Sequence, residues 1–387
     1  FKKLSTHSTE IKRGIYLDCN EPSIQNFIKI LVKGLLNRKD FSHGDDLVNM
    51  ISKRSDETTF QCAKDKVIEI VNKNPLFIVI DSREKYEAHN EVEMCITAGL
   101  IQTACNLCTK FARKGLQIKV CIADEIFPYI KEQYITNTLK YIKNPLYMYW
   151  RPKDLMRLIC WRLFKYLSVN KLNDFTETQI DWDSHSDIMN KMWMPYFGKE
   201  IINRRGIKEH TFPYILRHTH LRPRQLIYTC NKIASIAMRN GEFPHFSNST
   251  ILQGVLQSEI DLSDEILNSY SSVYARVGDI VSALEGMPIE FKSNELYVAA
   301  RRTASYWEQG SYSQLEFIKL VLELGIVGRK REGFHQNSKI IKADFVFALE
   351  DRLFVTQKDT CVIHPLFYSK LNINRNSPSD YCFYSFP

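Results

Sequence analysis

Apolar runs of strand length alternate with amphipathic stretches of helix length over the first 165 residues of the chain. Residues 14–18 have the composition of a strand, and residues 22–36 place apolar side chains at helical spacing after a Pro-Ser start. Residues 76–81 are almost wholly apolar and end in a carboxylate, which is typical of a central parallel strand buried on both faces. This alternation predicts an α/β domain with a parallel sheet over residues 1–167.

The same pattern predicts the remaining elements of this domain. A helix is expected from about residue 90, a strand over 117–122 and a last strand over 146–150. The helix after Arg151-Pro152 carries apolar residues at helical spacing, and we expect it to close the sheet domain.

Strand signals then fade, and helical periodicity with polar connections continues over residues 168–290. This region is predicted to be a mostly helical lid domain, in which Pro223 suits the first turn of a helix. Residues 372–387, at the other end of the chain, are rich in Ser, Asn and Tyr and are expected to form a loosely docked tail.

Residues 291–371 show a helix, a second helix and then a hairpin, which is the order of a winged-helix domain. The expected elements are helices over 296–309 and 313–324 and strands over 345–349 and 353–355.

Composition narrows the class of protein. With 387 residues, 44% hydrophobic and 25% charged, the chain has the make-up of a folded protein of two or three domains. No apolar run approaches the roughly 18 residues that cross a bilayer, and no signal-peptide core follows Phe1. The ten cysteines are scattered through apolar segments, which favours a reducing cytoplasm. Because the chain begins with Phe1, we expect further residues before it.

A carboxylate at the carboxyl end of a central strand occupies the place where open α/β sheets bind ligands, and Asp81 has that place. The segment Phe-Ile-Val-Ile-Asp-Ser-Arg-Glu-Lys-Tyr at 77–86 resembles the Walker B strand of a bacterial P-loop ATPase family related to signal-transduction (STAND) and AAA-type ATPases. Three later segments resemble the lid helix of that family (216–227) and its winged helix (323–329 and 362–367). The resemblance covers most of residues 14–370.

The resemblance implies a site for ATP and Mg²⁺. Asp81 would order the magnesium ion through water, and Glu84 would orient an attacking water molecule. Arg222, Arg224 and His220 would approach the phosphates. The alternatives are a strand-end cap for Asp81, a surface charge for Glu84 and a solvated helix start for the two arginines.

Two departures from the family pattern bear on catalysis. The catalytic Glu of such ATPases directly follows the Walker B Asp, but position 82 is Ser82. The sequence also contains no G-x-x-x-x-G-K-[ST] loop to hold the phosphates. We therefore expect the first strand of the P-loop NTPase-type sheet and its loop to precede Phe1; a degenerate pseudo-ATPase is the alternative.

Charge leaves a nucleic-acid interpretation open. The net charge of +8 is modest for this length, but Arg329, Lys330 and Arg331 follow one another in the expected wing and could neutralise phosphates. The helix at 314–323 is acidic and apolar, which suits packing against another domain better than the major groove. No nucleophile motif surrounds His364 and the other histidines, which disfavours hydrolase chemistry there.

These patterns predict a cytoplasmic ATP-binding regulatory switch, with ATP hydrolysis if a phosphate-binding loop precedes Phe1. Its partners would be an effector protein or further copies of itself, with no membrane, and the resemblance points to bacterial anti-phage defence as the setting. The alternative is a non-catalytic scaffold or a winged-helix DNA-binding protein.

Overall fold

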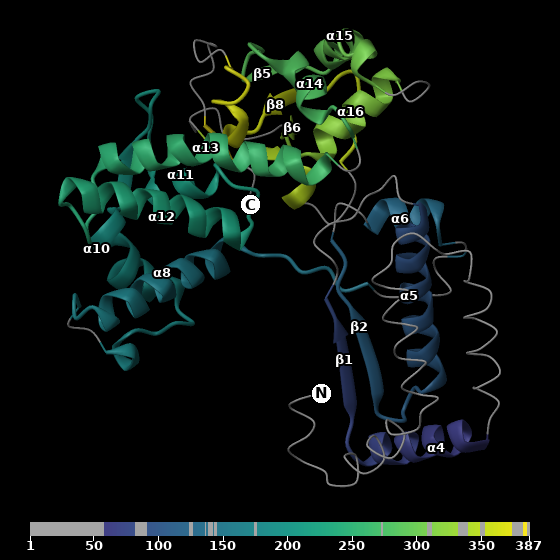
Figure 1. Cartoon of the computed structure of the whole chain (residues 1–387). Coiled ribbons are helices and arrows are strands. Elements are labelled where there is room, and N and C mark those ends of the chain that lie inside the picture. Colours follow the sequence, from purple (N-terminus) through teal and green to yellow (C-terminus); the bar gives the residue numbers. More distant parts are fainter. Residues whose placement is uncertain are drawn as a thin grey trace. The chain divides into compact units, whose positions relative to one another are not determined.

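A computed structural model of the chain describes residues 58–81, 91–123, 127–135, 137, 142, 145–173, 176–271, 274–307, 312–331, 340–348, 353–373 and 382–384 (Figure 1). The protein is mixed α/β. Contacts divide it into a first unit, Phe1–Tyr86 with Asn90–Asn144, and a second unit, Glu87–His89 with Pro145–Pro387. The strand expected at 14–18 and the helix expected at 22–36 lie outside the described residues.

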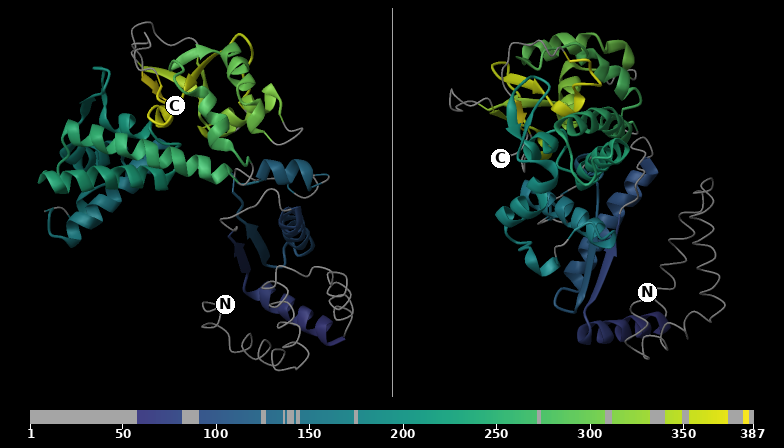
Figure 2. Two further views of the ribbon diagram at one scale, coloured as in Figure 1. Left: turned by 45° about the horizontal axis from the view of Figure 1, so that its top comes forward. Right: turned by 90° about the vertical axis from the view of Figure 1, so that its left-hand side faces the viewer.

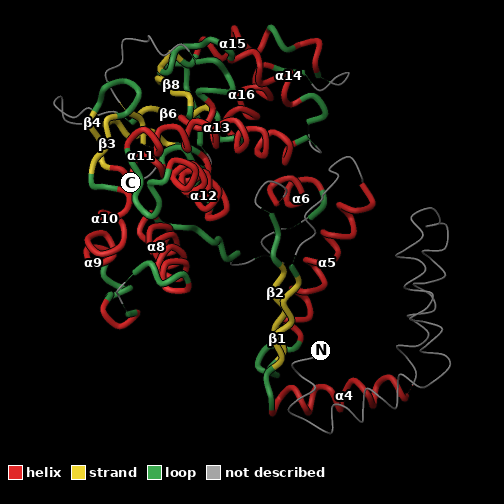
Figure 3. Tube along the Cα trace, turned by 60° about the vertical axis from the view of Figure 1, so that its left-hand side comes forward, coloured by secondary structure: helices red, strands yellow, loops and turns green. Residues whose placement is uncertain are grey.

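The first unit contains a parallel pair of strands with a helix between them in sequence. Its elements are α4 (Thr58–Lys73), β1 (Leu76–Ile80), α5 (Glu91–Lys110), β2 (Leu116–Val120) and α6 (Phe127–Gln133). β1 pairs with β2 in parallel from Leu76 opposite Leu116 to Ile80 opposite Val120, and α5 packs against β2 (Figure 3). The predicted strand, helix and strand are confirmed here.

Two sequence predictions about this sheet are wrong. β1 is not buried on both faces, because Phe77 is 59% exposed and Val79 is 66% exposed, while the buried core of the unit centres on α5 and α6. Residues 146–150 form no strand with any described residue, and Leu146 and Met148 are exposed. An apolar run has strand propensity, but a strand also needs a partner for its backbone groups.

The first part of the second unit is helical. Its main elements are α8 (Pro152–Val169), α9 (His185–Ile188), the π-helical turn η4 (Met189–Trp193), α10 (Met194–Phe197), the hairpin β3 (Glu200–Ile202) and β4 (Lys208–His210), α11 (Thr211–Leu216), α12 (Pro223–Asn240) and α13 (Asn248–Tyr270). Proline begins both α8 and α12, as predicted. The expectation that α8 closes the sheet domain is wrong, because its buried face packs against α12 and α9 in the second unit.

The second part of this unit is built on a five-stranded sheet. Its main elements are α14 (Val277–Val281), β5 (Glu290–Lys292), α15 (Asn294–Arg301), α16 (Gln314–Glu323), β6 (Val327–Lys330), β7 (Ile340–Asp344), the short helix η7 (Val346–Ala348), β8 (Thr360–Ile363), the short helix η8 (Pro365–Phe367) and β9 (Cys382–Tyr384). The strand order is β5-β8-β6-β7-β9, antiparallel except for the parallel pair β7 and β9.

The helix predicted at 296–309 is confirmed only in its first part, because α15 ends at Arg301 and a 3₁₀ turn follows at 304–306, whereas the second predicted helix corresponds to α16. The Ser313 hydroxyl caps α16 by accepting from the Glu316 amide at 3.0 Å. The predicted strands do not correspond. Residues 346–348 form a 3₁₀ turn after the fully buried Phe345, and 353–355 form no strand. Phe345 fills the core, and Val346 and Phe347 pack against it from a turn, which periodicity over so few residues does not distinguish from a strand.

Two hydrophobic cores lie in the second unit. The helical core comprises buried side chains between Leu155 and Val255 together with Cys382 and Tyr384, and the sheet core comprises buried side chains between Leu262 and Phe383. α13 runs between the helical layer and the sheet and contributes to both (Figures 1 and 2). The described residues include no helix with the length and hydrophobicity to span a bilayer.

Candidate functional site

Asp81 directly follows β1 and is exposed. It therefore stands at the carboxyl end of a parallel strand, the position at which α/β sheets bind ligands. Glu84 lies outside the described residues. Asp81 belongs to the first unit, whereas Arg222, Arg224 and His220 belong to the second. The candidate metal ligand and the candidate phosphate-binding residues therefore belong to different units, and each unit is described by itself.

The segment between α11 and α12 is a fixed turn. The Thr219 hydroxyl donates to the Leu216 carbonyl oxygen at 2.8 Å, and the His220 amide donates to Gln225 Oε1 at 2.7 Å. Leu221 has a φ of 55°, in the left-handed region. After this turn Pro223 begins α12. Side chains up to His220 are buried and exposure begins at Arg222, so the turn separates the predicted site residues.

The arginines of this turn face solvent, but His220 does not. The side chain of Arg224 is 82% exposed and lies 3.8 Å from Glu265, and Arg222 is also exposed. His220 is buried, with its ring stacked on Phe347 at 4.2 Å. Burial lowers the pKa of His220 well below its usual range, so the ring is neutral. A neutral, enclosed imidazole has neither the charge nor the access to bind a phosphate.

A buried ion pair joins Arg217, which directly precedes this turn, to Glu209 in β4. Arg217 donates to both carboxylate oxygens of Glu209, from Nη2 at 2.9 Å and from Nε at 3.1 Å. Glu209 also accepts from Asn203 Nδ2 at 2.7 Å and from the Tyr384 hydroxyl at 2.8 Å. Burial acts to lower the pKa of Arg217, but Glu209 raises it well above its usual range. The guanidinium therefore stays charged, and the neutral donors Asn203 and Tyr384 add to the solvation of the carboxylate that it pairs with.

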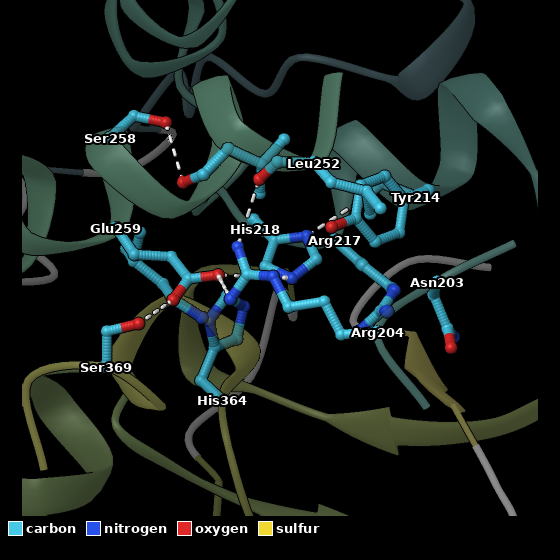
Figure 4. Close-up of polar contacts among 12 residues, drawn as sticks. Asn203, Arg204, Tyr214, Arg217, His218, Leu252, Ser258, Glu259, His364 and Ser369 are labelled. Atoms are coloured by element: carbon cyan, nitrogen blue, oxygen red, sulfur yellow. Dashed lines mark hydrogen bonds and ion pairs between the residues drawn. The ribbon is translucent and has the colours of Figure 1, made fainter. Parts of the chain in front are cut away.

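A second polar cluster adjoins the ion pair and contains His218, Glu259, Ser369 and Arg204 (Figure 4). His218 Nδ1 lies 2.7 Å from the Tyr214 carbonyl oxygen, so Nδ1 carries the proton and Nε2 is an acceptor. Burial, and then the Arg217 guanidinium, lowers the pKa of His218 well below its usual range. The Nε2 lone pair thus faces Glu259 Oε1 at 3.6 Å, without a hydrogen bond.

This second cluster has little room and no activated nucleophile. It borders a cavity of about 50 Å³, enough for a few water molecules and far below the roughly 300 Å³ of a small cofactor pocket. The Ser369 hydroxyl donates to Glu259 in a short hydrogen bond, so the carboxylate separates it from His218. His218 is therefore not placed to act as the base for this serine, which donates to a carboxylate instead.

The basic residues of the predicted wing are paired within the sheet. Arg329 Nη2 lies 3.2 Å from Asp344, and Arg331 Nε lies 2.5 Å from the same carboxylate. Lys330 Nζ lies 2.7 Å from Glu290. The three positive charges therefore meet two carboxylates, which weakens their attraction for nucleic acid.

The buried ion pair and the second polar cluster together form a polar junction. The residues that hold it together were not identified from the sequence. They are Glu209, Glu259, Ser369 and Tyr384, which reach their partners across separations of up to 175 residues. Local patterns carry no information about such distant pairs. A buried Glu at the middle of the three-residue strand β4 is a signal only once its burial is known.

Comparison of the chain with protein-family models, curated proteins and solved structures finds no match. The resemblance described above therefore rests on the residues quoted for it, and the geometry of the two units supplies the independent observations.

Proposed function

We propose that this chain is a nucleotide-dependent regulatory switch. The first unit would order a magnesium–nucleotide complex near Asp81, and the second unit would carry the lid and the winged helix that respond to it. An effector protein or a further copy of the chain would receive the signal in the cytoplasm, with phage defence as the setting.

The observation that carries the proposal is the place of Asp81. It follows β1 in a parallel β1-α5-β2 arrangement, where the carboxyl ends of the strands meet at one edge of the sheet. An exposed carboxylate at such an edge suits Mg²⁺, which keeps most of its water and takes one or two carboxylates.

The three segments of the lid and winged-helix resemblance also meet in the second unit. The ring of His220, from 216–227, lies 4.8 Å from that of His364, from 362–367. A Cβ on Gly325, from 323–329, would lie 3.0 Å from the same His220 ring. The antiparallel order β5-β8-β6, with α15 and α16 between β5 and β6 in sequence, supports the winged-helix assignment.

The residues of this chain provide a ligand for Mg²⁺ more clearly than a binding loop for the nucleotide. Asp81 supplies an oxygen ligand, and the exposed Arg222 and Arg224 supply charge that a phosphate could use. The 387 residues include no glycine-rich loop ending in Lys-Ser or Lys-Thr to hold a triphosphate. We therefore derive no hydrolytic step and assign the chain the metal-ordering carboxylate and the switch elements.

The test is to purify the native-length protein, denature it and chromatograph the nucleotide that it releases, then to measure binding of ATP with and without Mg²⁺. We expect bound ADP or ATP, and a loss of at least about tenfold in Mg²⁺-dependent affinity for Asp81→Asn. Asp65→Asn, which alters an exposed carboxylate on α4, is the matched control and should change nothing. Absence of nucleotide together with no Mg-ATP binding would instead favour a pseudo-ATPase scaffold.

DNA binding is the weaker alternative for the second unit. The wing cations have carboxylate partners, and α16 carries Glu316 and Glu323 against the single Lys319. Neither feature favours a phosphate backbone.

A further inference from the structure

β9 joins parts of the second unit that are far apart in sequence. It pairs in parallel with β7, with Ile340 opposite Cys382 and Lys342 opposite Tyr384. It is the edge strand of the five-stranded sheet and has three residues. The expectation of a loosely docked tail is therefore wrong at 382–384, where all three side chains are buried.

The side chains of β9 alternate between the two cores. Cys382 and Tyr384 pack in the helical core, whereas Phe383 packs in the sheet core. This is the period of two that a strand imposes, used here to join two layers. β9 thus holds the helical core and the sheet core together at one edge.

β9 also completes the surroundings of the buried ion pair. The Tyr384 hydroxyl donates to Glu209 Oε2 at 2.8 Å, and Cys382 Sγ lies 3.6 Å from Oε1 and 3.1 Å from Asn203 Nδ2. Loss of β9 would remove a strong donor from a buried carboxylate, but the bidentate bond from Arg217 would remain. The ion pair would survive in a more exposed form.

We propose that β9 is a releasable strap, which can leave the edge of β7 while both cores stay folded. Three features support local release: β9 is short, its strand pairing is with β7 alone among the described strands, and α13 still connects the two cores without it. Release exposes the edge of β7, which can accept an extended segment of another chain, and opens the polar junction at Glu209. This proposal about β9 does not depend on whether the first unit binds a nucleotide.

The native cysteines provide the test. Cys382 lies in β9, Cys361 in the central strand β8, and Cys160 in α8, and all three are buried. The full chain is exposed to iodoacetamide at several low urea concentrations, and alkylation of each cysteine is followed by peptide mass spectrometry. Each rate is divided by the rate of the same cysteine in the denatured chain. Release of the strap predicts that Cys382 reacts at least about tenfold faster than Cys361 and Cys160, with little dependence on urea.

Tyr384→Phe sharpens the test because it removes only the hydroxyl that donates to Glu209. We expect alkylation of Cys382 to accelerate by about 10- to 100-fold, as for loss of a hydrogen bond to a charged group, with Cys361 and Cys160 unchanged. Tyr166→Phe is the matched control, since this half-exposed ring packs on Phe243. One common rate for the three cysteines with a steep dependence on urea would show that β9 leaves only on global unfolding, and would overturn the proposal. The wild-type rates decide this even if a variant fails to fold.

Discussion

Removal of Arg217 should destabilise the second unit strongly. The side chain of Glu209 is 0% exposed and that of Arg217 is 7% exposed, so neither is screened by solvent. Arg217→Met keeps most of the side-chain volume but takes away two charge-assisted hydrogen bonds and leaves a buried carboxylate with neutral donors from Asn203 and Tyr384. A buried ion left without its partner costs about 3–5 kcal/mol, and we expect a loss of that size.

Urea unfolding followed by tryptophan fluorescence measures this loss for the second unit alone, because all five tryptophans lie in it. Arg224→Met is the control, since its side chain is 82% exposed, and it should stay within about 0.5 kcal/mol of the wild type. The double variant Glu209→Gln with Arg217→Met removes the unpaired charge and should recover at least half of the loss. A loss below about 1 kcal/mol for Arg217→Met, or no recovery in the double variant, would refute the assignment of a charged buried pair.

Three further predictions concern the same unit. Burial lowers the pKa of His364 to about 3, below its value of about 6.5 in the unfolded chain, so the neutral ring stabilises the fold above pH 6.5 and this stability is lost as the pH falls toward 3. The urea concentration at the unfolding midpoint should therefore decrease as the pH drops below 6.5. It should decrease less steeply for His364→Asn, which keeps an acceptor for the cap of η8, and equal slopes of midpoint against pH would contradict the prediction. Gly325→Ala should lower the thermal midpoint, because φ is +64° and the new Cβ would meet the rings of Phe347 and His220, whereas Gly278→Ala in α14 has open space and should not. Asp344→Asn removes the carboxylate shared by two arginines and should strengthen salt-sensitive binding of duplex DNA in a fluorescence-polarisation titration, and unchanged binding would show that these cations do not face a phosphate backbone.

The sequence predicted the elements that depend on local signals. The run before Asp81, the long helix after it and the helix begun by Pro223 are all present, because periodicity and proline act within a few residues. The prediction of a strand at 146–150 was wrong because strand formation depends on a partner strand that local sequence does not specify.

The polar junction could not be predicted for a related reason. Glu209 and Arg217 are eight residues apart on different elements, and their third partner, Tyr384, comes 175 residues after Glu209. His220 was predicted to approach the phosphates, but its ring is buried against aromatic rings from two other segments, Phe347 and Phe367. Which face of a turn is buried depends on tertiary packing, and the turn at 219–221 decides it here.

α13 has a mechanical consequence. Its 23 residues extend over about 34 Å, with Ile251 and Val255 in the helical core and Leu262 and Ile266 in the sheet core. Because this one continuous helix is packed in both cores, a rotation of the sheet is expected to carry the helical layer with it, with no hinge inside α13. The two layers are thus expected to tilt together as one lever, and motion of the unit concentrates at its edges.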